Sequence, residues 1–190
     1  NEISPRQGPI RLREFTLMEL ELFFDPENPS CNFLSKVKDE KLKLLPIQFR
    51  LNEIQEPIEV TPIEALEKGY VKTEWLAYFM ALSKIFLSQI GIPEENQRFK
   101  EKLPQERAHY SIQTYDHEVF LERWGWVEVA GLAYRTDYDL SRHIAYSKVD
   151  LKVFKAYPAP EIKKIKVIKP IPEAIKKDFK NEADKIFSLL

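Results

Sequence analysis

Five side chains near the start of the sequence combine chemistries that binding sites use. They occupy odd positions of a single stretch and are Arg11, Arg13, Phe15, Glu19 and Glu21. In an extended chain alternate side chains point to the same side, so these five would share one face. Guanidinium groups on that face can hold an anion, the phenyl ring can stack on another flat ring, and the carboxylates can bind an amine.

The element that must position these side chains is predicted to be a long β-strand. Even positions from Ile10 to Phe24 are nearly all apolar, which is the period of a strand with one buried face. The preceding residues 4–9, Ser-Pro-Arg-Gln-Gly-Pro, have the composition of a turn, so residues 1–24 are predicted to form a hairpin with a basic tip. Two alternatives stay open. The polar face of the strand could be an ordinary solvated sheet face with cross-strand ion pairs and no ligand. Residues 15–24 could instead form a helix, because three apolar residues there also have helical spacing.

Three parts of this stretch form a specific pattern: residues 1–6 (Asn-Glu-Ile-Ser-Pro-Arg), residues 10–16 (Ile-Arg-Leu-Arg-Glu-Phe-Thr) and Glu19. The pattern resembles motif 2 of the class II aminoacyl-tRNA synthetases, in the form carried by glycyl-tRNA synthetases. In that family motif 2 consists of two long antiparallel strands that hold ATP, joined by a loop that meets the acceptor end of the tRNA. The family also has an arginine directly before the Asn-Glu pair, which grips the α-phosphate, and this sequence starts one position after it.

A second block carries the same resemblance. It contains, in the order and spacing of the glycyl-tRNA synthetase core, Arg98-Phe99, Glu106, Ala108-His109-Tyr110, Asp116, Glu118 and Gly-Trp-Val-Glu-Val-Ala-Gly over residues 125–131. From the residues alone, alternation predicts strands over 109–116 and 126–130 that extend the hairpin as antiparallel additions. After Arg135, an N-cap at Thr136 or Asp137 predicts a short helix with Arg135 at its start.

The resemblance implies binding roles for eight side chains. Those assigned to ATP are Glu2, Arg13, Phe15 and Glu128, with Phe15 stacked on the adenine and Glu128 facing the ATP and its Mg²⁺. Those assigned to glycine are Glu19 and Arg135, and those assigned to tRNA are Arg6 and Arg11. Without the resemblance, Glu128 would be interpreted as a surface or paired carboxylate and Arg135 as a partner in a loop ion pair.

The implied reaction assigns no catalytic side chain. The glycine carboxylate attacks the α-phosphate of ATP, and the terminal hydroxyl of the tRNA then attacks the adenylate, so catalysis consists of positioning and charge neutralisation. No zinc site or catalytic triad is predicted, because Cys31 stands alone, the three histidines lack close ligand spacing and no glycine-rich phosphate loop is present.

Composition sets further bounds. The 190 residues are 44% hydrophobic and 12% aromatic, which is sufficient for a globular core. The net charge of −1 gives no global field for nucleic acid, so RNA contacts would come from local basic patches. A single cysteine fits a reducing compartment. The sequence contains no stretch of about 18 apolar residues, the length needed to span a bilayer. We therefore expect a soluble, cytoplasmic protein that does not bind a membrane.

Helix signals follow in the middle of the chain. Thr61-Pro-Ile-Glu64 is a capping box with proline at the first helical position, and Gly69 is placed to end that helix. A second helix is predicted from Thr73 to Ile90, with its aromatic stripe in the core. Short strands with a bend at a proline are predicted over residues 41–51. Towards the C-terminus, a basic strand is predicted over residues 161–169, followed by a last helix that opens at Pro172 and runs to the chain end.

We expect an α+β fold, built on the antiparallel sheet of a partial class II catalytic core. Residues 1–156 would form this core, with the motif 2 hairpin over 1–24, a helical segment over about 31–97 and core strands and a helix over 98–147. An insertion subdomain would occupy residues 157–190, with Tyr157 at the boundary. Both chain ends are expected to be cuts within a longer protein, because neither motif 1, which forms the family's dimer interface, nor motif 3 is present.

The predicted parent protein is a homodimeric glycine–tRNA ligase that uses ATP, Mg²⁺, glycine and tRNA(Gly). Half of the active site would be missing from this chain, so the chain alone is predicted to be inactive. The alternative is a synthetase-derived module that binds tRNA or other RNA and makes no adenylate.

Overall fold

The computed structural model describes residues 10–154, 156, 159, 162, 164–166 and 169–187. The chain divides into two compact units, Asn1–Leu151 and Lys152–Leu190. The predicted boundary residue Tyr157 lies outside the described residues. Among the described residues no helix is long and apolar enough to cross a bilayer.

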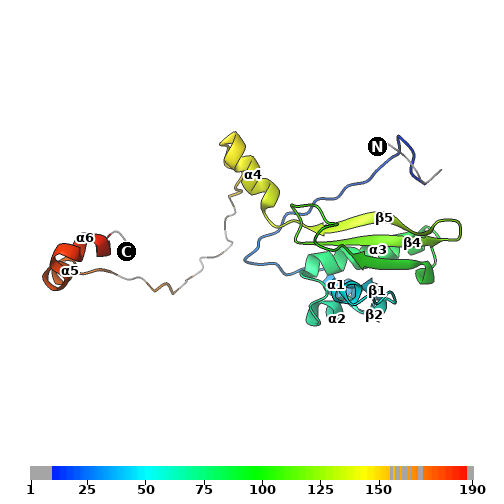
Figure 1. Cartoon of the computed structure of the whole chain (residues 1–190), viewed down its shortest axis with the longest axis horizontal. Helices are drawn as coiled ribbons and strands as arrows, with labels where there is room; N and C mark the ends of the chain where they lie inside the picture. The colour runs from blue at the N-terminus through cyan, green and yellow to red at the C-terminus, as the bar shows by residue number, and fades with distance from the viewer. Residues whose placement is uncertain are drawn as a thin grey trace. The chain divides into compact units, whose positions relative to one another are not determined.

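The described part of the first unit is built on a five-stranded sheet with the order β2-β1-β3-β4-β5 (Figure 1). The strands are β1 (Leu42–Leu45), β2 (Ile58–Val60), β3 (Gln97–Glu101), β4 (Gln113–Leu121) and β5 (Gly125–Tyr134). Neighbouring strands are antiparallel except β1 and β3, which are parallel. The fold is therefore α+β as predicted, but the sheet is mixed and the all-antiparallel prediction is wrong. The chain passes from β2 to β3 through α2, α3 and the 3₁₀ turn η2, and this crossover lays β3 alongside β1 in the same direction.

The helices of this unit are η1 (Leu34–Val37), α1 (Ile47–Leu51), α2 (Pro62–Glu67), α3 (Glu74–Gln89), η2 (Glu94–Asn96) and α4 (Tyr138–Ser147). The predicted capping box of α2 and the predicted start of α3 at Thr73 are confirmed. Thr61 and Glu64 form the reciprocal capping box at α2, and the Thr73 hydroxyl caps α3. Gly69 has a φ of 69° directly after α2, a conformation that glycine adopts without strain.

The Thr61 cap yields a prediction for the stability of the chain. The Thr61 hydroxyl accepts the Glu64 N–H at 3.1 Å, and the Glu64 carboxylate accepts the Thr61 N–H at 2.6 Å. Replacing Thr61 by Ala should lower the free energy of unfolding by about 1 kcal/mol, because one backbone donor at the start of α2 loses its acceptor. Urea denaturation measures this. The exposed Thr16, replaced by Ala in the same way, should leave the midpoint unchanged, and an equal loss in both variants would contradict the cap.

The prediction that the aromatic stripe of α3 is core is wrong for its C-terminal half. Trp75 and Phe79 are half-buried, whereas Leu82, Phe86 and Ile90 are 38%, 48% and 61% exposed. The buried residues of α3 are Leu76, Ala77, Met80, Ala81 and Lys84. Two alanines on the buried face allow the helix backbone to approach the sheet closely. There α3 packs against the core side of the strands, where the core cluster also contains Leu42, Leu44, Val60, Phe99 and Tyr115.

A histidine is buried within this core. The His117 ring is fully buried and stacks on Phe99 with centroids 4.1 Å apart. Its Nδ1 lies 2.8 Å from Ser83 Oγ, and its Nε2 lies 3.1 Å from Gln97 Oε1. The Gln97 amide nitrogen donates to the Ile92 carbonyl, so Oε1 is the acceptor and His117 Nε2 carries the proton. Burial lowers the pKa of His117 to about 4, so the ring is neutral at pH 7 and Ser83 donates to Nδ1.

The predicted strand over residues 10–24 is not formed. These residues have no regular secondary structure, and Leu17, Met18 and Leu20 are 60%, 84% and 66% exposed. The segment contacts β5 through side chains: Arg11 Nη2 donates to the Glu128 carbonyl at 2.8 Å, and the Phe24 ring stacks on Tyr134 with centroids 6.0 Å apart. A strand requires a backbone partner along its length, and these contacts do not supply a ladder.

Other element predictions were confirmed only in part. The first of the two strands predicted over residues 41–51 is β1, but the second is α1, which begins directly after Pro46. β4 starts four residues later than predicted and extends to Leu121, and β3 was not predicted. In the second unit, α5 (Pro172–Phe179) opens at the predicted proline, but η3 (Lys180–Glu182) separates it from α6 (Ala183–Phe187). The described residues of the predicted basic strand, 162, 164–166 and 169, form no strand.

Candidate functional site

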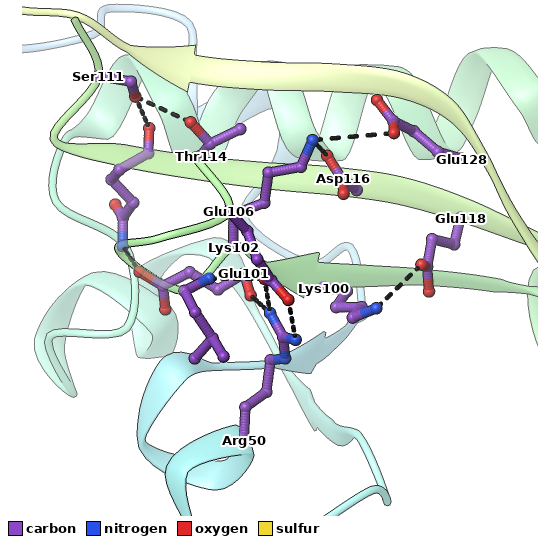
Figure 2. A network of polar contacts seen from close by, with 12 residues as sticks. Arg50, Lys100, Glu101, Lys102, Glu106, Ser111, Thr114, Asp116, Glu118 and Glu128 are labelled. Carbon is purple, nitrogen blue, oxygen red and sulfur yellow. Dashed lines mark hydrogen bonds and ion pairs between the residues drawn. The ribbon is translucent and has the colours of Figure 1, made fainter. Parts of the chain in front are cut away.

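One face of the sheet carries charged side chains from three neighbouring strands (Figure 2). Phe99 of β3 and Tyr115 of β4 point into the core on the α3 side. Alternation along the strands therefore turns Lys100 and Asp116 to the opposite face. The register places Lys100 opposite Asp116 and Arg98 opposite Glu118, so unlike charges meet across the two strands. We call this surface the charged face. Its members are Arg98, Lys100, Lys102, Asp116, Glu118 and Glu128.

At one end of the charged face Glu118 is paired with two cations. Arg98 Nε donates to Glu118 Oε2 at 2.7 Å, and Lys100 Nζ lies 3.6 Å from Glu118 Oε1. The Arg98 guanidinium also lies over the Trp126 ring, 4.1 Å from its centroid. Arg98 of β3 thus contacts side chains of both β4 and β5.

At the other end a single ammonium lies between two carboxylates. Lys102, directly after β3, places Nζ 3.0 Å from Asp116 Oδ1 and 3.8 Å from Glu128 Oε2. Burial raises the pKa of Asp116, and the nearby Lys102 ammonium opposes this effect. Burial also disfavours the charged form of Lys102, but the contact with Asp116 and the negative charges of Glu128 and Glu106 together outweigh it, and the pKa of Lys102 is raised. Lys102 is therefore charged at neutral pH.

A loop beside the charged face is fixed by one arginine. Arg50 of α1 donates to both carboxylate oxygens of Glu106, at 2.5 and 2.9 Å, and to the Glu101 carbonyl at 2.6 Å. The Glu106 carboxylate also accepts the Leu103 N–H at 2.9 Å. The hydrogen bonds from Arg50 lower the pKa of Glu106 to about 2. The loop that follows β3 is thereby held in one conformation.

Behind the charged face a buried carboxylate joins three elements, β3, α1 and β4. Glu101 accepts hydrogen bonds from the Ile47 N–H at the start of α1, from the Gln113 amide and from the Tyr115 hydroxyl. Gln113 in turn donates to the Tyr70 carbonyl at 2.8 Å. Sequence reasoning missed Arg50, Glu101 and Lys102. Their partners lie 12 to 56 residues away, so no local signal could have identified the first two. The alternating charges of Arg-Phe-Lys-Glu-Lys over residues 98–102 could have suggested Lys102.

Arg135 lies directly after β5 and before α4, as predicted. Its Nε donates to Asp139 Oδ2 at 2.8 Å, and its guanidinium lies 4.1 Å from the centroid of the Tyr110 ring. The hydrogen bond to Asp139 raises the pKa of Arg135. The helix start fixes Asp139, and the loop before β4 fixes Tyr110. The plane of the guanidinium is therefore set by the protein, which favours bidentate binding of a carboxylate.

The structure brings together only some of the predicted site residues. Arg11 contacts Glu128 through the backbone carbonyl. Glu128 and Arg135 lie on the same strand or its end, but seven residues along it separate them by roughly 20 Å. Arg13 and Glu19 are exposed, Phe15 is partly buried, and all three belong to the segment without regular structure, so the predicted strand face that they share is not formed. Glu2 and Arg6 lie outside the described residues.

The donor atoms on the charged face fit a magnesium ion that arrives with a nucleotide. The Glu128 side chain is 40% exposed, and Mg²⁺ is commonly held by one or two carboxylates together with substrate phosphates. In the part of the chain that the structure describes, no group of three or more His, Cys, Asp or Glu side chains has the arrangement of a metal site. A resident, all-protein magnesium site is therefore not indicated for these residues.

Comparison with known proteins gives a consistent result. No protein-family model matches the chain. Its sequence is 52% identical to the glycine–tRNA ligase of Pyrococcus horikoshii over 95% of this chain and 32% of that protein. It is 49% identical to the glycine–tRNA ligase of Pyrococcus furiosus over 100% of this chain and 34% of that protein. For the glycine–tRNA ligase of Aeropyrum pernix the identity is 44%, again over 100% of this chain and 33% of the relative.

The chain thus spans about one third of the length of the curated relatives that it matches. Sequence identity of 44% to 52% over nearly all of the chain confirms the resemblance that the motif residues indicated. The chain belongs, as a stretch of about one third of the family's length, to the glycyl-tRNA synthetases.

Proposed function

We propose that this chain is part of the catalytic domain of a glycine–tRNA ligase, which activates glycine with ATP to glycyl-adenylate and transfers the glycyl group to the 3′ end of tRNA(Gly). The observation that carries the proposal is the identity of 44% to 52% to proteins named glycine–tRNA ligase, over 95% or more of the chain. In this proposal residues 1–156 belong to the catalytic core and residues 157–190 begin an insertion subdomain. The parent enzyme is a homodimer whose interface lies in another part of its sequence.

The proposal assigns each substrate to a set of side chains. Glycine is bound by Arg135, whose guanidinium plane is set by Asp139 and Tyr110, and by Glu19, whose carboxylate suits the amine. ATP is bound by Glu2, Arg13, Phe15 and Glu128. The tRNA acceptor end is contacted by Arg6 and Arg11.

The chemistry on this chain is positioning. Arg135 holds the glycine carboxylate, the group that attacks phosphorus, and Glu128 holds the nucleotide from the charged face. Magnesium bound with ATP would neutralise phosphate charge. The carboxylate of Glu128 suits this role because it is partly exposed, while its neighbour Asp116 is buried.

Glycine-dependent exchange of labelled pyrophosphate into ATP tests the proposal. The full-length protein that contains this chain should catalyse the exchange with glycine and not with alanine or serine. The 190-residue chain alone should not catalyse it. A full-length protein that retains tRNA on a filter but shows no exchange with glycine would contradict the ligase and favour an RNA-binding module.

A further inference from the structure

A lysine without an assigned role contacts the carboxylate to which ATP binding is assigned. We propose that Lys102 is a positioning residue in ATP binding, whose ammonium holds the Glu128 carboxylate in place beside Asp116 and offsets the negative charge of both. This inference rests on the proposed function. It concerns a residue that acts through Glu128 and does not require Lys102 to touch the nucleotide.

The geometry places Lys102 between two strands. Its backbone N–H donates to the Thr114 carbonyl at 2.9 Å, which anchors the residue after the end of β3. From there Nζ reaches Asp116 at 3.0 Å and Glu128 at 3.8 Å (Figure 2). Gly131 lies opposite Asp116 in the register, and a Cβ at Gly131 would come within 3.6 Å of Glu128 Oε1. The Glu128 carboxylate therefore lies beside Gly131, where no side chain intervenes, and it also contacts the Lys102 ammonium.

The charge of Lys102 also offsets the negative charge of two carboxylates. Asp116 and Glu128 are both within 4 Å of the same ammonium, so without it two carboxylates would face each other with no cation between them. The other charged groups around Lys102 are Lys100 on its own strand, Glu118 on β4, Glu106 in the following loop and Arg11 at the Glu128 carbonyl. Lys100 is paired with Glu118, whereas the Lys102 ammonium lies within 4 Å of both Asp116 and Glu128. Lys102 is therefore placed to offset the charge of these two carboxylates.

The test uses the full-length protein and pyrophosphate exchange with glycine at varied ATP concentration. Lys102→Met should raise KM for ATP about tenfold, with a much smaller change in kcat, because the Glu128 carboxylate loses the ammonium that holds it in place. Lys102→Arg keeps the charge and should restore KM for ATP in large part.

Lys100→Met is the matched control, because Lys100 lies on the same face two residues earlier, in β3, and pairs with Glu118. It should leave KM for ATP unchanged. A Lys102→Met enzyme that behaves like Lys100→Met, or that only melts at lower temperature, overturns the inference. If Lys102→Met fails to fold, Lys102→Gln replaces it with the same expected results. If the wild-type enzyme shows no exchange with glycine, the proposed function itself is wrong. If the wild type is active and only the expected effect of Lys102→Met is missing, the inference about Lys102 alone is wrong.

Discussion

Replacing Arg135 by Lys in the full-length protein should lower kcat/KM for glycine by about 30- to 1000-fold in pyrophosphate exchange, which corresponds to roughly 2–4 kcal/mol. Lysine keeps the positive charge but has no planar fork for two parallel hydrogen bonds to the glycine carboxylate. The KM for ATP should change far less, because the side chains assigned to ATP remain. The structure adds a reason for the size of the effect. Asp139 and Tyr110 hold the guanidinium plane, and an ammonium would use neither support in the same way.

Arg142→Lys is the matched control for this experiment. Arg142 also lies over a tyrosine ring, 5.3 Å from the centroid of Tyr138, but it belongs to the exposed surface of α4. Its replacement should leave the kinetics for glycine unchanged. If Arg135→Lys keeps the wild-type kcat/KM for glycine, Arg135 is an ordinary ion-pair partner of Asp139 and the glycine site lies elsewhere.

The second large effect is a loss of stability in acid that originates at His117. Burial lowers the pKa of His117 from 6.5 to about 4 in the folded chain. Between these two values the unfolded chain binds a proton that the folded chain does not. The free energy of unfolding therefore falls as the pH falls through this window. At about 1.4 kcal/mol per pH unit, the full interval corresponds to roughly 3 kcal/mol. The contribution is fully present above pH 6.5 and is lost by about pH 4.

Urea denaturation of the 190-residue chain at several pH values between 7 and 4 measures this effect. The His117→Gln variant should be less stable at pH 7, because Gln cannot reproduce both hydrogen bonds and the stacking on Phe99. Its stability should nevertheless fall less steeply than that of the wild type as the pH is lowered. The exposed His143, replaced by Gln, is the control and should keep the wild-type slope. Equal slopes in wild type and His117→Gln would show that His117 is not the source.

Much of the helical structure could be predicted because its signals are local. The capping box at α2, the Thr73 cap of α3 and the start of α5 at Pro172 all depend on residues within one turn of the helix end. Local signals did not predict which side of α3 faces the core. Its aromatic stripe and its alanine-containing stripe both have helical spacing, and close contact with the sheet selected the smaller residues.

The candidate site shows the same division. The order and types of residues over 98–135 were sufficient to assign the family, and they placed Arg135 correctly between β5 and α4. The partners of these residues were not predictable. Asp139 could be guessed from its position four residues along the chain, whereas Lys102 meets Asp116 and Glu128 only because three strands adopt one register.

The sequence by itself therefore determined the family, through the order and types of its motif residues, and the starts of α2, α3 and α5, which depend on neighbours within a few positions. Only the tertiary structure decided which strands pair, that β1 and β3 run parallel, and which carboxylates share a cation. The stretch over residues 10–24 makes the reason clear. Its alternation is that of a strand, but a strand exists only where a second backbone offers its donors and acceptors, and the contacts to β5 come from the side chains of Arg11 and Phe24.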